Sequence, residues 1–399
     1  MARNTKKEEL FTVKEVVLLL ILTCVANTMI FFLINNNGEE KNFVNTTDDA
    51  LDEIIESYYY IKDNYYGEIN EKDLINGAIK GMTEALGDDY STFIEESDSD
   101  TYDILLKGEY IGVGIQISQL INSNEIIVTT VFENSPAGRA GLMLGDVVKS
   151  INGIKADTMT TTTMGDYIKN GNITTFEIVV DRNGEEKKFK VSRGNIVLDS
   201  VVSQMIDNAG KKVGYINMNV FALNTDEQFK EHLKKLEKEG MDSLIIDVRA
   251  NTGGHLSTVT NIISEFLDSS KVIYQTSGKT TKVVNSKGRE TKKYKIVILA
   301  DNGSASASEV LLAALKESYG ATFVGQTTFG KGTVQEMQTI SSTGENYKIT
   351  TKKWLTPQGN WINKVGIKPD YEVILNNEYY ENPTMENDNQ LQEALKLLK

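Results

Sequence analysis

The sequence predicts an α/β core that follows a helical region and an inserted β-rich domain, with one transmembrane helix at the N-terminus. Three observations carry this prediction. An almost wholly apolar run lies near the start of the chain, a β-rich segment follows the first helical patterns, and strand-like and helical patterns alternate after about residue 195. At 399 residues the chain is long enough for two or three domains that each bury a core.

Residues 1–35 are predicted to form a cytoplasmic tip and a transmembrane anchor. The run 16–34 is almost wholly apolar and has about the length needed to cross a bilayer. Arg3, Lys6 and Lys7 precede it, so the positive-inside tendency places the N-terminus in the cytoplasm and the body of the chain outside the cell membrane. A cleaved signal peptide is the competing interpretation, but the run is long and no convincing small-x-small cleavage site ends it.

The single cysteine excludes a disulfide within the chain, and the net charge excludes some classes of partner. Cys24 lies inside the apolar run and cannot form an intramolecular disulfide, so the fold depends on its hydrophobic core. The formal net charge of −14 argues against nucleic acid or an anionic membrane surface as a partner for the body of the chain. We therefore expect no nucleic acid partner, and membrane contact only through the N-terminal helix.

Two segments with different hydrophobic periods precede the core. Residues 36–106 are predicted to form an N-terminal helical region, in which the pattern is helical from Asp48 to about Glu95. Its apolar stripe, which includes Leu51, Ile54 and Ile55, is interpreted as a core or packing stripe and not as a cofactor contact. Residues 107–194 are β-rich, and the β-branched run 126–131 predicts one short strand.

Residues 195–375 are predicted to form the α/β core, and residues 376–399 a polar linker with a terminal helix. Strand-like runs alternate with helical patterns in the core, which favours parallel pairing of the strands. The expected strands are 214–218, the run that ends at Asp247, and 295–300; the expected helices are 225–239, one that ends at Leu267, one that follows Ser306, and 389–398. After Lys331 the chain becomes β-rich through Trp354.

A serine and a lysine in the core have residue types that can act together as nucleophile and base. Residues 301–309 read DNGSASASE, and Lys331 follows Ser306 by 25 positions in the run FGKGTVQ. A serine hydroxyl needs an adjacent base to take its proton, and burial can lower the pKa of a lysine toward neutrality. Of the two histidines, His232 lies in a charged helical pattern that indicates a solvated face, whereas His255 follows two glycines and remains a competing base.

Both motifs also have a structural interpretation. Ser306 and Glu309 match the S-x-x-E capping box, and on pattern alone capping is the more frequent meaning. The two roles are compatible, because N–H groups at a helix start can stabilise an oxyanion. Residues 325–331 fit the opening of a phosphate-binding loop, but Gly332 stands where that loop needs a Ser or Thr hydroxyl, and a β-like segment follows. We reject the nucleotide interpretation.

Together these motifs resemble the carboxy-terminal processing peptidases, which are serine proteases with a Ser/Lys dyad and an embedded PDZ domain. The resemblance covers nearly everything after about Asp48. It implies that Ser306 is the nucleophile, that Lys331 is the general base, and that Gln335, four positions later, supports the lysine.

A second motif of the family, a hydrophobic strand ending in D-L-R-x-N-P-G-G, appears as LIIDVRANTGG at 244–254. The resemblance implies that the backbone amides of Gly254 and Ala307 form the oxyanion hole. Thr252 stands where the family usually has proline, but both glycines, which allow close approach of the backbone to a substrate carbonyl, are kept. An isolated Gly-Gly pair could equally be a tight strand-to-helix connection.

The β-rich segment resembles a PDZ domain through residues 135–142 and 145–153. A glycine-containing run falls where PDZ domains place their carboxylate-binding loop, and it comprises Ile111, Gly112, Val113, Gly114 and Ile115. The amides of that loop hold the terminal carboxylate of a peptide while the peptide adds a strand to the sheet edge. Alone, this run would more often be a simple turn.

The resemblance implies a membrane-anchored, single-pass serine endopeptidase that recognises the free C-termini of extracytoplasmic proteins. It implies no metal and no organic cofactor. In relatives the helical region can take part in dimer formation, so the resemblance allows a homodimer. The alternative is a PDZ adaptor that binds protein tails without cutting them. Retention of Ser306, Lys331 and Gln335 together argues against an adaptor, which has no need of a buried uncharged lysine.

Overall fold

The computed structural model describes residues 49–94, 106–120, 123–132, 134–170, 172–288, 292–339 and 345–399. The predicted transmembrane run 16–34 and Cys24 lie outside the described residues. Within the described ranges, no helix combines the length and the apolar character that a membrane crossing needs.

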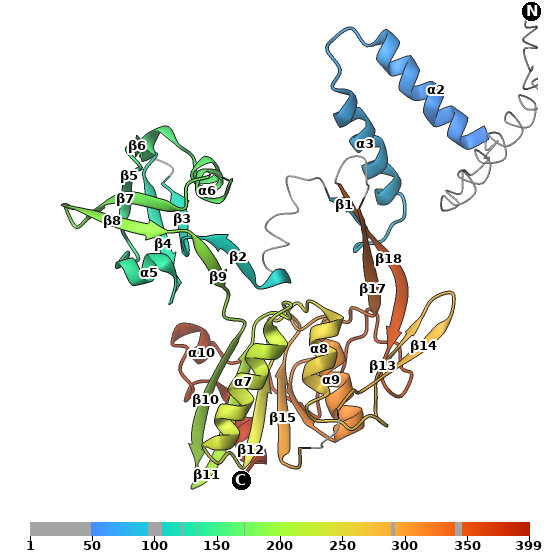
Figure 1. Cartoon of the computed structure of the whole chain (residues 1–399). Helices are drawn as coiled ribbons and strands as arrows, with labels where there is room; N and C mark the ends of the chain where they lie inside the picture. The colour runs from blue at the N-terminus through green and yellow to red at the C-terminus, as the bar shows by residue number, and fades with distance from the viewer. Residues whose placement is uncertain are drawn as a thin grey trace, which may run out of the picture. The chain divides into compact units, whose positions relative to one another are not determined.

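Two helices open the described chain, α2 (Asp49–Asn64) and α3 (Glu71–Glu84) (Figure 1). The apolar stripe of α2 is not part of a core in the single chain, because Leu51, Ile54 and Ile55 are 43%, 44% and 52% exposed. The stripe is therefore not buried in the single chain, and its interpretation as a packing surface stays a prediction. The helical period is present in α2, but these side chains stay exposed in the single chain.

The β-rich segment folds around its own apolar core, which includes Val128, Ile151 and Phe176. Its antiparallel sheet has the strand order β3-β4-β5-β7-β8, and β2 pairs with β9 in a separate two-stranded sheet. The elements are β2 (Glu109–Gly112), β3 (Ile115–Gln119), β4 (Ile126–Val131), α5 (Pro136–Ala140), β5 (Val147–Ile151), β6 (Ile154–Lys155), α6 (Thr161–Asn170), β7 (Thr175–Arg182), β8 (Glu185–Ser192) and β9 (Gly194–Val197). The predicted strand 126–131 is confirmed.

The core is built on a six-stranded sheet with the order β10-β11-β12-β15-β16-β19. The strands are β10 (Val201–Asn208), β11 (Lys211–Met218), β12 (Ser243–Asp247), β15 (Lys295–Ala300), β16 (Thr322–Gly325) and β19 (Tyr371–Glu372). Strands β11, β12, β15, β16 and β19 pair in parallel, and β10 pairs antiparallel with β11. The predicted parallel α/β core is confirmed.

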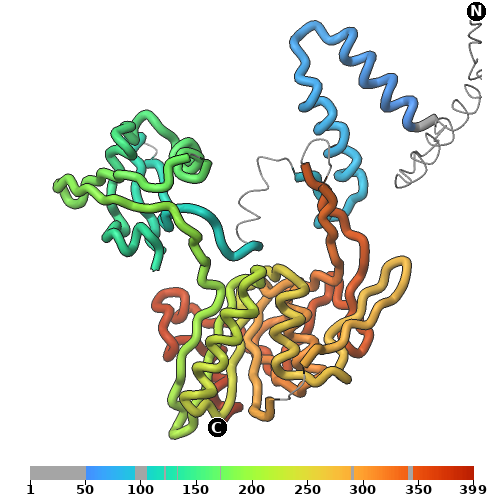
Figure 2. Tube along the Cα trace, in the orientation of Figure 1, coloured from blue at the N-terminus to red at the C-terminus, as the bar shows by residue number. Residues whose placement is uncertain are grey.

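Helices cover both faces of this sheet (Figure 1). On one face, α7 (Thr225–Lys238), α8 (Leu256–Ile263) and α9 (Ala307–Ala314) share a buried cluster with Ile216 and Ile246. On the other face, α11 (Asn389–Leu397) packs Leu391 and Leu395 against Ile245, and the short α10 (Asn377–Glu381) precedes it. Figure 2 shows the red C-terminal end of the chain returning to the yellow-green strands.

A second, five-stranded sheet adjoins the core. It contains β1 (Thr92–Ile94), β13 (Val272–Ser277), β14 (Thr281–Asn285), β17 (Thr333–Thr339) and β18 (Asn346–Leu355). Strand β18 is central, because β17, β13 and β1 all pair with it. The sheet therefore joins the segment that follows Lys331 to residues 92–94.

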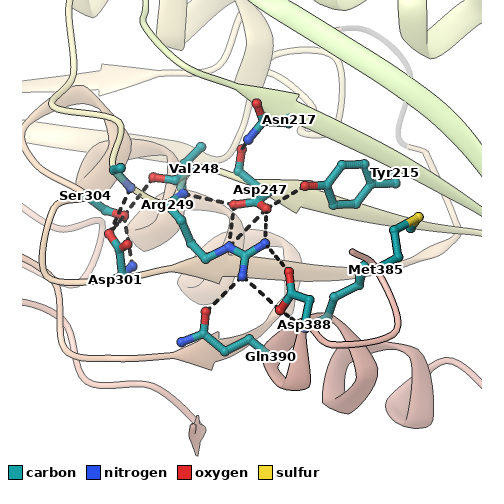
Figure 3. A network of polar contacts seen from close by, with 12 residues as sticks. Tyr215, Asn217, Asp247, Val248, Arg249, Asp301, Ser304, Met385, Asp388 and Gln390 are labelled. Carbon is teal, nitrogen blue, oxygen red and sulfur yellow. Dashed lines mark hydrogen bonds and ion pairs between the residues drawn. The ribbon is translucent and has the colours of Figure 1, made fainter. Parts of the chain in front are cut away.

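An ion network fastens the C-terminal helix to the core sheet (Figure 3). Arg249 Nη2 donates to Asp247 Oδ2 at 2.6 Å and to Asp388 Oδ2 at 2.7 Å, and Arg249 Nη1 donates to Gln390 Oε1 at 3.0 Å. Tyr215 Oη donates to the same Asp247 oxygen at 2.6 Å. Asp388 also caps α11 by accepting the N–H of Leu391 at 2.9 Å. One buried guanidinium thus joins the end of β12 to the start of α11.

Candidate active site

The nucleophile candidate lies at the start of α9, directly after β15. Ser306 is half-buried, with φ +56° and ψ −115°, a conformation that non-glycine residues seldom adopt. Backbone strain of this kind costs about 1–3 kcal/mol and persists only where surrounding contacts impose it. Asn251 supplies such contacts, since its carbonyl oxygen accepts the Ala305 N–H at 3.0 Å and the Ser308 hydroxyl at 2.7 Å.

The Gly-Gly turn lies against this serine because glycine leaves room for it. A Cβ on Gly253 would lie 2.9 Å from both the Ala305 carbonyl oxygen and Ser306 Cβ. Gly254 has φ +145°, and a Cβ there would lie 2.2 Å from the carbonyl oxygen of Phe221. Both glycines are therefore required by the close approach of this chain's own backbone, and their approach to a substrate carbonyl stays a prediction.

Lys331 and Ser306 line one cavity of about 280 Å³, together with Gly254 and Gln335. Trp354 Nε1 donates to the Lys331 carbonyl oxygen at 2.7 Å and fixes the backbone of the loop. The structure thus brings together the residues that the sequence predicts as nucleophile, base, supporting amide and one oxyanion donor. Ala307, the second predicted donor, is buried at the first position of α9.

The surroundings of Lys331 favour an uncharged amine at moderately alkaline pH. Burial lowers the pKa of Lys331 to about 8, and the charge of Lys348 lowers it too, whereas Asp88 and Glu309 raise it. Lys331 Nζ also lies 4.7 Å from the centroid of the Tyr90 ring, whose face attracts the ammonium form. A lysine with this pKa can accept a proton at a pH where an ordinary lysine cannot.

Gln335 is held in one orientation by two threonines. Its Nε2 donates to Thr333 Oγ1 at 2.9 Å and to Thr350 Oγ1 at 3.0 Å. Both donor hydrogens of the amide are thereby engaged, which leaves Oε1 as the group that can accept a bond from Lys331. The role of Gln335 as a support for the base stays a prediction.

Glu309 is the residue whose importance the sequence reasoning missed. Its buried carboxylate accepts the Ser306 N–H at 2.9 Å, as in a capping box, but it also accepts the Lys331 N–H at 2.9 Å. The Gly330 N–H at 2.7 Å and the Thr328 hydroxyl at 2.6 Å complete its set of donors. Burial raises the pKa of Glu309, and these donors oppose that rise. The S-x-x-E motif revealed the first contact, whereas the other three depend on the fold.

The two histidines occupy different surroundings. His255 lines the same cavity, its Nε2 lies 3.1 Å from the Leu106 carbonyl oxygen, and burial lowers its pKa. His232 lies on α7, as expected, but it is only partly exposed, and its Nδ1 lies 2.7 Å from Ser203 Oγ. Among the described residues, no group of three or more His, Cys, Asp or Glu side chains is placed to hold a metal ion.

The predicted carboxylate-binding run is divided between a strand and a turn. Ile111 and Gly112 belong to β2 and pair with β9, whereas Val113 and Gly114 form the turn into β3, which begins at Ile115. Gly114 has φ +86°, and a Cβ there would lie 2.1 Å from Ser135 Cβ. Strand β3 is an edge of its sheet. A glycine turn that leads into an edge strand is the arrangement that strand addition by a peptide requires.

Fold and site together define a serine peptidase of the α/β class with an attached PDZ domain. Residues 212–373 match the model of peptidase family S41, residues 110–192 match the PDZ domain model, and residues 31–98 match the N-terminal domain of the activating protease CtpB. The chain therefore belongs to peptidase family S41, the carboxy-terminal processing peptidases, and is a serine-type enzyme.

Curated relatives and a solved structure agree with this assignment. The chain is 34% identical over 333 residues to the carboxy-terminal processing protease CtpB of Bacillus subtilis, a match that covers 82% of this chain and 68% of that protein. It is 33% identical over 334 residues to CtpA of the same organism, with 83% and 70% covered. The structure of the photosystem II D1 C-terminal processing protease superposes with a TM-score of 0.50 at 24% identity, covering 87% of this chain and 90% of that chain, and supports the fold.

Proposed function

We propose that this chain is a membrane-anchored endopeptidase that captures the C-terminal tails of extracytoplasmic proteins with its PDZ domain and cleaves them with Ser306 and Lys331. The observation that carries the proposal is the shared cavity of about 280 Å³ in which a strained serine, a lysine with a pKa of about 8 and Gly254 meet.

The proposed reaction uses these groups in turn. Lys331 Nζ takes the hydroxyl proton while Ser306 Oγ attacks the peptide carbonyl, and the N–H groups of Gly254 and Ala307 stabilise the oxyanion. Collapse of the tetrahedral intermediate breaks the C–N bond, and the leaving amine takes the proton from Lys331. Water then attacks the acyl-enzyme with Lys331 again as base, which releases the acid and restores Ser306. Gln335 Oε1 orients Lys331 through this cycle.

The proposed substrate and location rest on other parts of the chain. The edge strand β3 and the turn at Gly114 support capture of a free C-terminus. The apolar run 16–34, with Arg3, Lys6 and Lys7 before it, supports a single-pass anchor with the catalytic body outside the membrane. The exposed apolar stripe of α2 supports a homodimer formed through the N-terminal helices.

Comparison of three variants tests the base. We expect Ser306→Ala and Lys331→Ala to abolish cleavage of a protein with an apolar C-terminal tail, and His255→Ala to retain much of it. Because only the uncharged amine accepts a proton, kcat/KM of the wild type should fall as pH falls below about 8. Tail binding measured in parallel should survive in Ser306→Ala.

The opposite ranking, with Lys331→Ala active and His255→Ala inactive, would overturn the Ser/Lys mechanism. A wild-type chain that binds tails but never cleaves them would instead support the adaptor alternative.

A further inference from the structure

The catalytic cavity is lined by a second lysine, Lys348, which no part of the mechanism uses so far. Lys348 lies on β18 directly opposite Met337 of β17, and directly opposed residues of an antiparallel pair project from the same face. Met337 lines the cavity as well. The next residues on this face, Gln335 and Thr350, are joined by a hydrogen bond of 3.0 Å. One face of the β17–β18 pair therefore carries both Lys348 and Gln335, and both residues line the cavity with Lys331.

The backbone of Lys348 is fixed on both sides. Met337 pairs with it from β17, and Thr92 pairs with it from β1. Its side chain is half-buried and lines the cavity. The positive charge of Lys348 therefore influences the protonation of other groups that line the cavity, including Lys331.

The charged and polarisable groups around Lys331 act in opposite directions. The Tyr90 ring, Asp88 and Glu309 favour the ammonium form of Lys331. Burial and the positive charge of Lys348 favour the neutral amine. His255 also lines the cavity, and burial lowers its pKa and favours its neutral form. The charge of Lys348 therefore acts on the protonation of Lys331 in the direction opposite to Asp88, Glu309 and the Tyr90 ring.

We propose that Lys348 keeps Lys331 in the uncharged form that the reaction needs, acting through the base and not on the substrate. The proposal rests on the function of Lys331 as general base. Like charges on two residues that line one cavity repel each other, so the positive charge of Lys348 disfavours protonation of Lys331. This makes Lys348 a positioning residue whose contribution is electrostatic.

The test is the pH dependence of kcat/KM for the full-length chain, measured between about pH 6 and pH 10 on a peptide with a free C-terminus. Lys348→Met keeps the length of the stem but removes the charge. We expect the acidic limb of its profile to move to higher pH, with activity lost near neutral pH and recovered under more alkaline conditions. If the pKa of Lys331 rises by about 1, the fraction of neutral Lys331 near neutral pH falls about tenfold.

Two further variants give the controls. Lys348→Arg keeps the charge and should keep the midpoint of the wild type. Lys352→Met removes a lysine from the same strand that pairs with the exposed Glu336 and does not line the cavity, so it should leave the profile unchanged. Thermal unfolding of each variant confirms that the fold is kept.

An unshifted limb in an active Lys348→Met variant would overturn the proposal. A raised KM with an unshifted limb would also overturn it and would show that Lys348 binds an anionic group of the substrate. Failure of the Ser/Lys mechanism itself is distinguishable, because it would appear as cleavage by Lys331→Ala.

Discussion

Replacing Glu309 with glutamine tests whether one buried carboxylate holds the nucleophile and the base together. Oε2 accepts the N–H groups of Ser306 and Lys331, and Oε1 accepts the Gly330 N–H and the Thr328 hydroxyl. Glutamine has nearly the same shape but only one acceptor oxygen, and its NH2 group would face two donors. One pair of donors therefore loses its acceptor in Glu309→Gln.

The size of the effect follows from burial. Glu309 is 0% exposed, so water cannot replace the missing acceptor. A buried donor left without a partner costs about 1–3 kcal/mol, and two such donors cost roughly 2–6 kcal/mol. Part of this loss should appear in the free energy of unfolding. The remainder should appear in kcat, because relaxation of the 328–331 loop moves Lys331 away from the strained Ser306.

Urea unfolding and steady-state kinetics of the full-length chain measure the two parts. Glu237→Gln is the matched control, since Glu237 pairs with Lys292 at 3.0 Å with 30% of its side chain exposed. That change should alter the free energy of unfolding by less than about 1 kcal/mol and leave kcat unchanged. If Glu309→Gln matched this control in both measurements, the inferred coupling between the two catalytic loops would be refuted.

Three other predictions concern the remaining parts of the chain. Asp388→Asn keeps the α11 cap but removes one of the two carboxylates that bind the mostly buried Arg249, and should lower the free energy of unfolding by about 1–3 kcal/mol in urea titrations. Deleting residues 107–194 should abolish the preference for a peptide with a free C-terminal carboxylate over its amide, and an undiminished preference would disprove carboxylate recognition at 111–115. Protease added to intact cells with a permeable wall should reach the catalytic body, whereas protection until the membrane is broken would place the body in the cytoplasm.

The sequence predicted the parts of the fold whose signals are local. The strand 295–300 is a short apolar run between helical patterns, and this composition is typical of a parallel strand that is buried on both faces. The serine and lysine could be singled out as candidates because their motifs are short and their residue types suit the chemistry. The Gly-Gly turn was singled out because it matches the family's second motif, and the structure shows the close backbone approach that requires glycine there.

The misses have a common physical cause, which is dependence on distant segments. The helical stripe at Leu51 has the period of a core surface, but a period does not say whether another part of the chain covers it. Glu309 contacts the 328–331 loop, about 20 positions further along the chain, and no local pattern encodes that contact. The pairing of β1, β17 and β18 likewise brings Tyr90 beside Lys331 and places Lys348 on the wall of the same cavity.

The structure shows what the Asp, Arg and Asn side chains of the D-x-R-x-N part of the second motif bind. Arg249 joins Asp247 to the C-terminal helix (Figure 3), while two residues later Asn251 organises the turn beside the nucleophile. The Asn251 side chain donates to the Met218 carbonyl oxygen at 2.9 Å and accepts the Gly253 N–H at 2.9 Å. Arg249 thus binds the C-terminal helix, and Asn251 holds the Gly253 N–H beside Ser306. If α11 packs less tightly, the backbone from Arg249 to Asn251 should shift and displace Gly254. We therefore expect Asp388→Asn to lower kcat as well as the free energy of unfolding.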